Sequence, residues 1–143
     1  MAHAGQTIEN RVTGERITFV TTAADSGGEV VAMDSVWPRP GSRAIEHVHP
    51  AAEERWEVAA GRAGFRIGGE ERFAGPGEVV VAPPGTPHVA WNAGEDEVRV
   101  RIELRPALRW EEFAERLFRG DEDPAALLAE FTPEIELAAR QGE

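Results

Sequence analysis

Short runs of alternating apolar residues, separated by turn residues, fill the chain up to about residue 105. In the clearest run, residues 98–104, every second residue is Val, Ile or Leu and the residues between them are charged. This period of two is typical of a strand with one buried face and one solvent-facing face. Glycines and prolines between the runs mark tight turns. Many short strands at this spacing predict an all-β fold, a sandwich or a barrel.

Four more runs have the same character, and they lie at residues 17–21, 29–36, 63–67 and 79–81. Gly68-Gly69 follows the third run and predicts a hairpin turn. We therefore assign the predicted barrel to residues 13–105. Residues 1–12 carry no comparable pattern and are expected to form a flexible N-terminal arm.

The last third of the chain changes to a helical period. Trp110, Phe113 and Leu117 lie at positions i, i+3 and i+7, which predicts an amphipathic helix over residues 107–119. This apolar stripe is interpreted as packing against the barrel rather than as a partner site or a mobile lid.

Two further helices are expected to begin where an N-cap residue precedes a proline, at Asp123-Pro124 and at Thr132-Pro133. Residues 106–143 are therefore predicted to be a C-terminal helical extension packed on the barrel. Whether this extension acts as a lid is left open.

Composition limits the function. At 143 residues the chain is expected to be one domain. Its formal net charge of −11 disfavours binding to nucleic acid and to anionic membrane surfaces. With no signal-like or membrane-spanning apolar run, a cytoplasmic location is expected. The absence of Cys, Lys and Tyr excludes a thiol nucleophile, a Schiff-base lysine and a tyrosine acid. Metal-centred chemistry is nearly the only catalytic option left.

Three of the four histidines lie in two blocks between residues 41 and 92. His47 and His49 are spaced by two, so they share one face of a predicted strand. His88 follows the turn residues of the second block and is expected to reach the same point from another strand. With a carboxylate, these residues would form an N₃O ligand set that suits Mn, Fe, Ni, Cu or Zn.

Glu53 and Glu54 compete for the fourth ligand position, and strand parity separates them. Glu54 shares a face with Trp56 and Val58, whereas Glu53 shares the other face with charged residues. Because the apolar face must point inward, Glu54 is predicted to be the ligand and Glu53 to be solvated.

The positions within the two blocks resemble the paired signature of the cupin superfamily. The first block reads Gly41-x5-His47-x-His49-x4-Glu54-x6-Gly61, and the second reads Gly77-x5-Pro83-x-Gly85-x2-His88-x3-Asn92. The resemblance is to a small single-domain bacterial cupin of the type-2 conserved-barrel kind. It implies a double-stranded β-helix (jelly-roll) barrel, extended here by short C-terminal α-helices. It also implies one divalent transition metal per chain and a homodimer.

Similar cupins include oxalate oxidases, oxalate decarboxylases, flavonol dioxygenases and zinc-dependent polyketide cyclases. The first hypothesis is a metalloenzyme of dioxygenase or oxidoreductase type, in which Glu54 could also act as a catalytic base. A non-redox cyclase, isomerase or decarboxylase is the second hypothesis. The third is a cupin that binds a small ligand without turnover.

The substrate is expected to be a small aromatic or carbonyl-bearing molecule, because aromatic residues are candidates for the wall of the barrel mouth. The candidate pocket residues are Met33, Trp37, Trp56, Phe65 and Asn92. Core packing is an equally plausible role for the apolar ones, and Asn92 could instead close a turn. Trp91 has the opposite parity to His88 and is expected to face outward.

Overall fold

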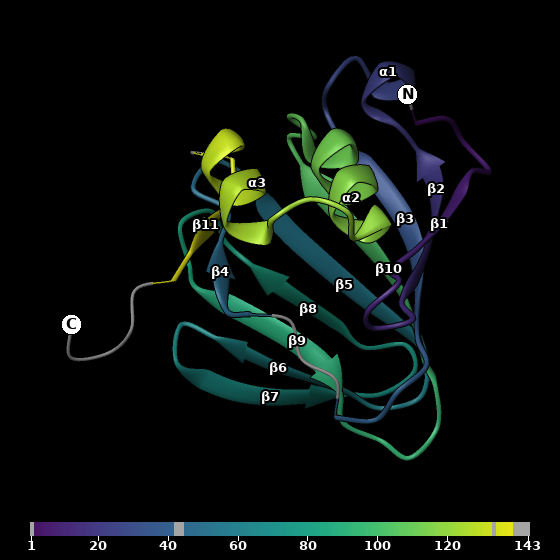
Figure 1. Cartoon of the computed structure of the whole chain (residues 1–143). Helices are drawn as coiled ribbons and strands as arrows, with labels where there is room; N and C mark the ends of the chain where they lie inside the picture. The colour runs from purple at the N-terminus through teal and green to yellow at the C-terminus, as the bar shows by residue number, and fades with distance from the viewer. Residues whose placement is uncertain (1, 42–44, 133, 139–143) are drawn as a thin grey trace.

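The computed structural model describes residues 2–41, 45–132 and 134–138. Two antiparallel sheets face each other and enclose the core (Figure 1). The larger sheet has six strands in the order β1-β2-β3-β10-β5-β8, and the smaller sheet has five in the order β11-β4-β9-β6-β7. The predicted all-β double-stranded β-helix is therefore confirmed.

The strands of the larger sheet are β1 (Thr7–Glu9), β2 (Arg16–Thr21), β3 (Val31–Trp37), β5 (Glu53–Ala60), β8 (Val79–Ala82) and β10 (Val98–Arg105). Those of the smaller sheet are β4 (His47–Val48), β6 (Ala63–Ile67), β7 (Glu70–Ala74), β9 (His88–Asn92) and β11 (Glu136–Leu137). The helices are α1 (Ala23–Ser26), α2 (Trp110–Arg119) and α3 (Pro124–Glu130).

The predicted period of two explains how the larger sheet encloses the core. Val98, Val100, Ile102 and Leu104 of β10 are all buried, whereas the arginines and the glutamate between them are exposed or half-buried. β5 and β3 flank β10. β5 alternates in the same way, whereas in β3 three consecutive residues, Val31, Ala32 and Met33, are buried. Burial of these faces is the main stabilising contribution in the barrel.

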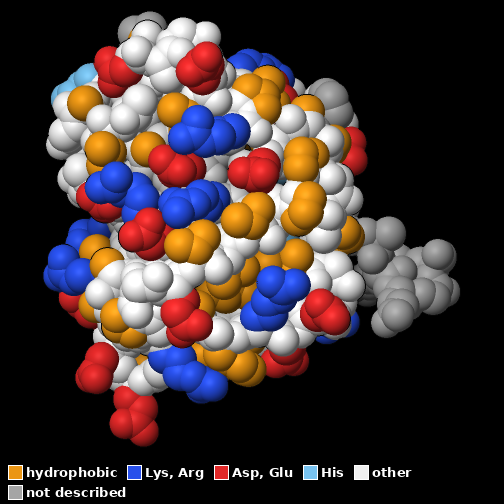
Figure 2. Space-filling view, turned by 180° about the vertical axis from the view of Figure 1, so that it is seen from behind, with side chains coloured by type: hydrophobic (Ala, Val, Ile, Leu, Met, Phe, Trp, Pro, Cys, Tyr) orange, Lys and Arg blue, Asp and Glu red, His pale blue; other side chains and the backbone are white. Residues whose placement is uncertain are grey.

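The outer face of the larger sheet carries charges of both signs. Arg101 on β10 pairs with Asp34 on β3, with 2.5 Å between Nε and Oδ1. Arg55 on β5 lies 3.7 Å from Glu103. The view from behind in Figure 2 shows basic, acidic and hydrophobic side chains side by side. No helix in the described part of the chain has the length and apolar character needed to cross a membrane.

The helices cover one end of the barrel (Figure 1). Phe118 of α2 joins the main barrel core, whereas Phe113 packs with Leu127, Phe131 and Ile135 in a second, smaller core. α3 begins as predicted, with the Asp123 side chain accepting a hydrogen bond from the amide of Ala125. We call the segment formed by α2, α3 and residues up to 135 the C-terminal cap.

Two expectations about the chain ends are wrong. Residues 7–9 lie within the expected flexible arm but form β1, because they pair with β2. The helix expected to begin at Thr132-Pro133 is not seen in residues 134–138, where β11 instead pairs with β4. Pro133 and residues 139–143 lie outside the described residues. The smaller sheet is thus completed by a strand from the C-terminal extension.

Candidate metal centre

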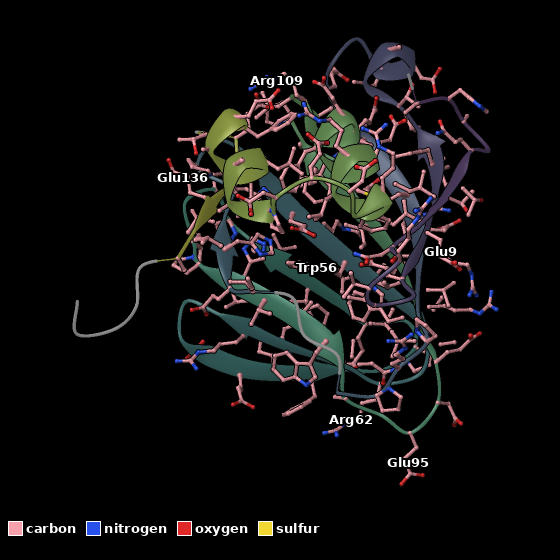
Figure 3. The ribbon with its side chains drawn as sticks, viewed as in Figure 1. Glu9, Trp56, Arg62, Glu95, Arg109 and Glu136 are labelled. Carbon is pink, nitrogen blue, oxygen red and sulfur yellow. The ribbon has the colours of Figure 1, made fainter. Side chains whose placement is uncertain are left out.

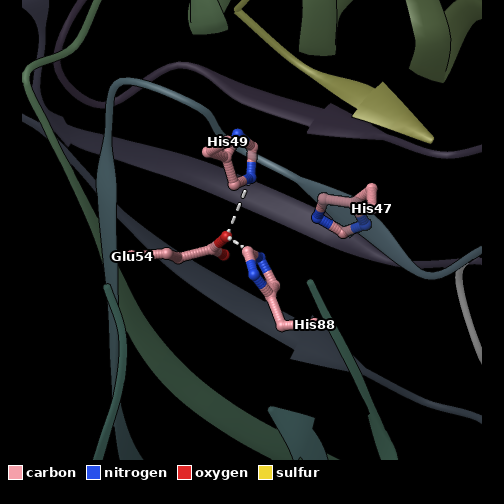
Figure 4. A group of neighbouring side chains, drawn as sticks. All are labelled: His47, His49, Glu54 and His88. Atoms are coloured by element: carbon pink, nitrogen blue, oxygen red, sulfur yellow. Dashed lines mark hydrogen bonds and ion pairs between the residues drawn. The ribbon is translucent and has the colours of Figure 1, made fainter. Parts of the chain in front are cut away.

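Four side chains predicted as ligands converge inside the barrel (Figure 4). His47 lies on β4, His49 directly follows that strand, His88 opens β9, and Glu54 comes from β5 of the opposite sheet. One potential ligand atom from each residue lies within 4.8 Å of the corresponding atoms of the other three. The pairing of β4 with β9 explains part of this convergence, because His47 and His88 are direct register partners.

Backbone carbonyls orient two of the imidazole rings. Nδ1 of His47 lies 2.8 Å from the carbonyl oxygen of Ile45, and Nδ1 of His88 lies 3.0 Å from that of Thr86. A carbonyl can only accept, so each Nδ1 must carry the hydrogen. Nε2 of each ring is then the nitrogen that is free to bind a metal, as second-shell hydrogen bonds commonly arrange.

Glu54 is the buried carboxylate of the cluster. Its Oε1 lies 3.0 Å from Nε2 of His49 and 3.0 Å from Nε2 of His88. Burial alone would raise the pKa of Glu54, but the contacts and positive potential of the two histidines hold it well below its usual range. Glu54 is therefore ionised at neutral pH, as a metal ligand must be.

The pKa values of two histidines move in opposite directions. Burial lowers the pKa of His47 to about 4, and the charge of His49 adds to this effect. Burial also acts to lower the pKa of His88, but its hydrogen bond to Glu54 and the charge of that carboxylate raise the value above 6.5 overall. Nε2 of His88 lies 3.0 Å from Oε1 of Glu54, so a proton on this nitrogen would be held between the two groups.

The residues fit a divalent transition metal. Three imidazole nitrogens and one carboxylate are the donors that Mn, Fe, Ni, Cu and Zn accept. Ligand atoms about 2.1 Å from one cation lie at most about 4.2 Å apart, so the observed cluster needs only a small contraction. Nε2 of His49 is buried, and it lies 3.0 Å from Oε1 of Glu54, so these two atoms are already placed side by side as two ligands of one cation would be.

Aromatic rings surround the cluster on two sides. Trp56 on β5 meets the His88 ring edge-on at 5.3 Å between centroids, and Phe65 lies behind it at 5.1 Å. Figure 3 shows Trp56 between the two sheets. On the other side, Trp110 of α2 meets the His49 ring edge-on at 5.6 Å.

The predicted pocket residues occupy different places. Trp56 adjoins the cluster, and Met33 and Phe65 are fully buried in the barrel core. Asn92 donates to the carbonyl oxygens of Trp37 and Asp96 and accepts from the amide of Gly94, so it closes a turn. That these residues line a substrate pocket stays a prediction.

Trp91 faces away from His88, as its parity indicates, but it is 6% exposed. It lies across from Gly64 of β6, and its ring meets Phe73 edge-on at 6.2 Å. The absence of a side chain at Gly64 leaves the room that the indole ring fills.

Sequence reasoning missed two residues near the site. Trp110 was interpreted only as part of an apolar helical stripe, and no local signal places α2 against His49. Glu15 precedes β2 and accepts hydrogen bonds from Ser35 Oγ at 2.6 Å and from Trp37 Nε1 at 3.1 Å. Burial raises the pKa of Glu15 despite these two donors. A second sequestered carboxylate therefore lies in the barrel wall.

The fold and the site define the class of protein: a double-stranded β-helix with a histidine and glutamate cluster inside. Residues 38–104 match the family described as the cupin domain. In this part of the chain, the sequence is similar to the cupin domain family, and the fold agrees with that similarity.

Comparisons with known proteins agree with the fold. The protein named polyketide synthase CurC, from Streptomyces cyaneus, is 33% identical over 90 residues, which cover 63% of this chain and 56% of that protein. A predicted oxalate decarboxylase from Thermotoga maritima is 17% identical with a TM-score of 0.64, over 72% of this chain and 92% of that one. The polyketide cyclase RemF from Streptomyces resistomycificus is 19% identical with a TM-score of 0.59, over 73% and 78%.

Proposed function

We propose that this chain is a metal-dependent enzyme that acts on a small, carbonyl-bearing organic substrate. The observation that carries the proposal is the convergence of three imidazole rings and one ionised carboxylate on one point inside the barrel. His47, His49, Glu54 and His88 would hold one divalent transition metal. When bound, such a metal can polarise a carbonyl oxygen as a Lewis acid or support oxygen chemistry.

The side chains of the site have separate roles in this proposal. His47 and His88 are held in place by backbone carbonyls, so they keep the site in shape without substrate. Glu54 is ionised and would supply negative charge to the metal, and it would act as a base only after leaving its contacts with His49 and His88, which lower its pKa. Trp56 and the cap residue Trp110 keep bulk water away from the cluster and present ring surfaces to an apolar substrate.

Two reaction classes remain. The similarity to a protein named as a polyketide synthase favours the non-redox class, such as cyclisation or isomerisation. That match spans little more than half of the relative, so the activity itself is our proposal. The second candidate is the dioxygenase type expected from sequence, which is supported by the donor set because three His and one Glu also suit Fe and Mn.

The test begins with elemental analysis of protein purified from its native host. The metal-free protein is then reloaded separately with Zn, Mn and Fe and incubated with aromatic β-dicarbonyl compounds. Product formation is followed together with oxygen consumption. Turnover of the zinc form without oxygen uptake would support the non-redox class, and oxygen uptake that requires Fe or Mn would support the dioxygenase type. Compounds that bind and are recovered unchanged with every metal would contradict an enzymatic role.

A further inference from the structure

The indole N–H of Trp110 is a buried hydrogen-bond donor without a protein acceptor. Among the described residues, Nε1 of Trp110 is a buried side-chain nitrogen with no hydrogen-bond partner, whereas Nε2 of His49, which also lacks a well-formed hydrogen bond, lies 3.0 Å from Oε1 of Glu54. Leaving such a donor unsatisfied costs about 1–3 kcal/mol, so native proteins usually supply a partner. The metal centre accounts for His49, and Trp110 calls for a different explanation.

Trp110 and His49 both line one cavity. The cavity lies between the barrel mouth and the C-terminal cap. Their rings are 5.6 Å apart between centroids. An acceptor atom in this cavity would therefore lie beside both Trp110 and His49, which is one of the four candidate ligands.

The other walls of the cavity are mostly apolar. Leu104 and Ala107 border it from the barrel side, and Phe113 and Phe131 border it from the cap. Arg109 and Glu134 also line it, but their side chains pair with each other (Figure 3 labels Arg109). The remaining volume is about 10 Å³, close to what one water molecule needs. The space thus suits one oxygen atom.

We propose that Trp110 is a substrate-positioning residue that donates its indole N–H to an oxygen atom of the ligand at the metal centre. The inference rests on the proposed function and adds a recognition element to it. The ligand class is a molecule with a carbonyl, carboxylate or enolate oxygen beside an apolar body. The oxygen would lie between Trp110 and His49, in the space between the barrel mouth and the C-terminal cap.

The test compares wild-type protein with Trp110→Phe, which keeps an aromatic ring and removes the N–H. Trp91→Phe serves as the control, because Trp91 lies on the face of β9 opposite to His88. Each protein is first titrated with cobalt(II), and the loaded protein is then titrated with acetohydroxamate as an oxygen-donor probe. Probe affinity is read from the visible absorption of cobalt.

We expect equal cobalt stoichiometry in all three proteins and a probe affinity that is roughly 3- to 10-fold weaker in Trp110→Phe only. Equal probe affinity in all three proteins would overturn the role of Trp110 while leaving the metal centre intact. Failure of the wild-type protein to take up cobalt would instead overturn the proposed function, and this inference with it.

A second measurement avoids dependence on the stability of the variant. In wild-type protein labelled with ¹⁵N and loaded with zinc, the Trp110 indole N–H signal, assigned by its contacts with His49 and Phe113, should shift downfield when the probe binds. If the probe binds and this signal does not move, the inference is wrong.

Discussion

At the scale of single residues, the proton shared between His88 and Glu54 has a direct consequence for metal binding. Because its contact with Glu54 raises the pKa of His88, this ring keeps its proton to a higher pH than an ordinary histidine does. A metal must displace that proton before Nε2 can coordinate it. His47 has a pKa of about 4, so at neutral pH its ring carries no extra proton that a metal would have to displace.

We predict that metal affinity falls as pH falls through the pKa of His88, by about tenfold per pH unit once this ring is protonated. The sign follows from the raised pKa, because the protonated form dominates on the acidic side. Competition titrations with a chromophoric chelator at several pH values between 8 and 5 measure the effect. An affinity that is constant over this interval would contradict the assignment of His88 as a ligand.

The convergence of the candidate ligand residues could be predicted from sequence because the spacing within each block is local. His47 and His49 are separated by two residues, and the parity of Glu54 with Trp56 separated it from Glu53. The shared proton could not be predicted in the same way. It depends on a distance between β9 and β5, which belong to different sheets. The contact of Trp110 with His49 likewise depends on how α2 docks.

At the scale of elements, the close approach of two strands in the smaller sheet depends on Gly64. A Cβ atom at this position would lie 2.4 Å from Cε2 of Trp91, which is buried. The backbone of Gly64 does not have a positive φ, so the constraint is one of space rather than of conformation. This residue therefore makes room for the indole ring across the β6–β9 pairing.

We predict that Gly64→Ala lowers the free energy of unfolding by about 1–3 kcal/mol through overpacking. Urea or thermal unfolding followed by circular dichroism measures the change. Gly75→Ala is the matched control, since its Cβ would meet only Glu78 Oε1 at 3.6 Å and its φ is also not positive. Equal stability of the two variants would show that the Trp91 ring can move aside at no cost.

Strands with several alternating residues could be predicted well. β10, β6 and β2 lie where the period of two places them, because one face of each is buried. Two of the short strands, β1 and β11, could not be predicted. β11 has only two residues, and its pairing with β4 depends on the path that the chain takes after the C-terminal cap. A proline after an N-cap residue at Thr132 indicated a helix, but tertiary pairing prevailed over this local signal.

At the scale of the whole molecule, the barrel leaves an edge strand with apolar side chains on its outer face. Val79 and Val81 of β8 are 44% and 36% exposed, and β8 is the last strand of the larger sheet. Exposed edges of this kind are commonly covered by a second chain. We therefore retain the expectation of a homodimer as a prediction.

Light scattering coupled to size-exclusion chromatography tests the prediction of a homodimer. We predict the mass of two chains for wild-type protein and a shift towards one chain for the double variant Val79→Glu/Val81→Glu. Val20→Glu on β2, where the side chain is 37% exposed, is the control and should leave the mass unchanged. A wild-type mass of 15.6 kDa across the accessible concentration range would refute the prediction.

The most direct test of the central claim is a calorimetric titration of metal-free protein with a divalent transition metal. We predict saturable uptake of one equivalent per chain, little change in Glu53→Gln, and at least about a 100-fold loss of affinity in Glu54→Gln, because only Glu54 faces the three histidines. Absence of saturable uptake by the wild-type protein, or equal affinity in the two variants, would contradict the assignment of this cluster as a metal centre.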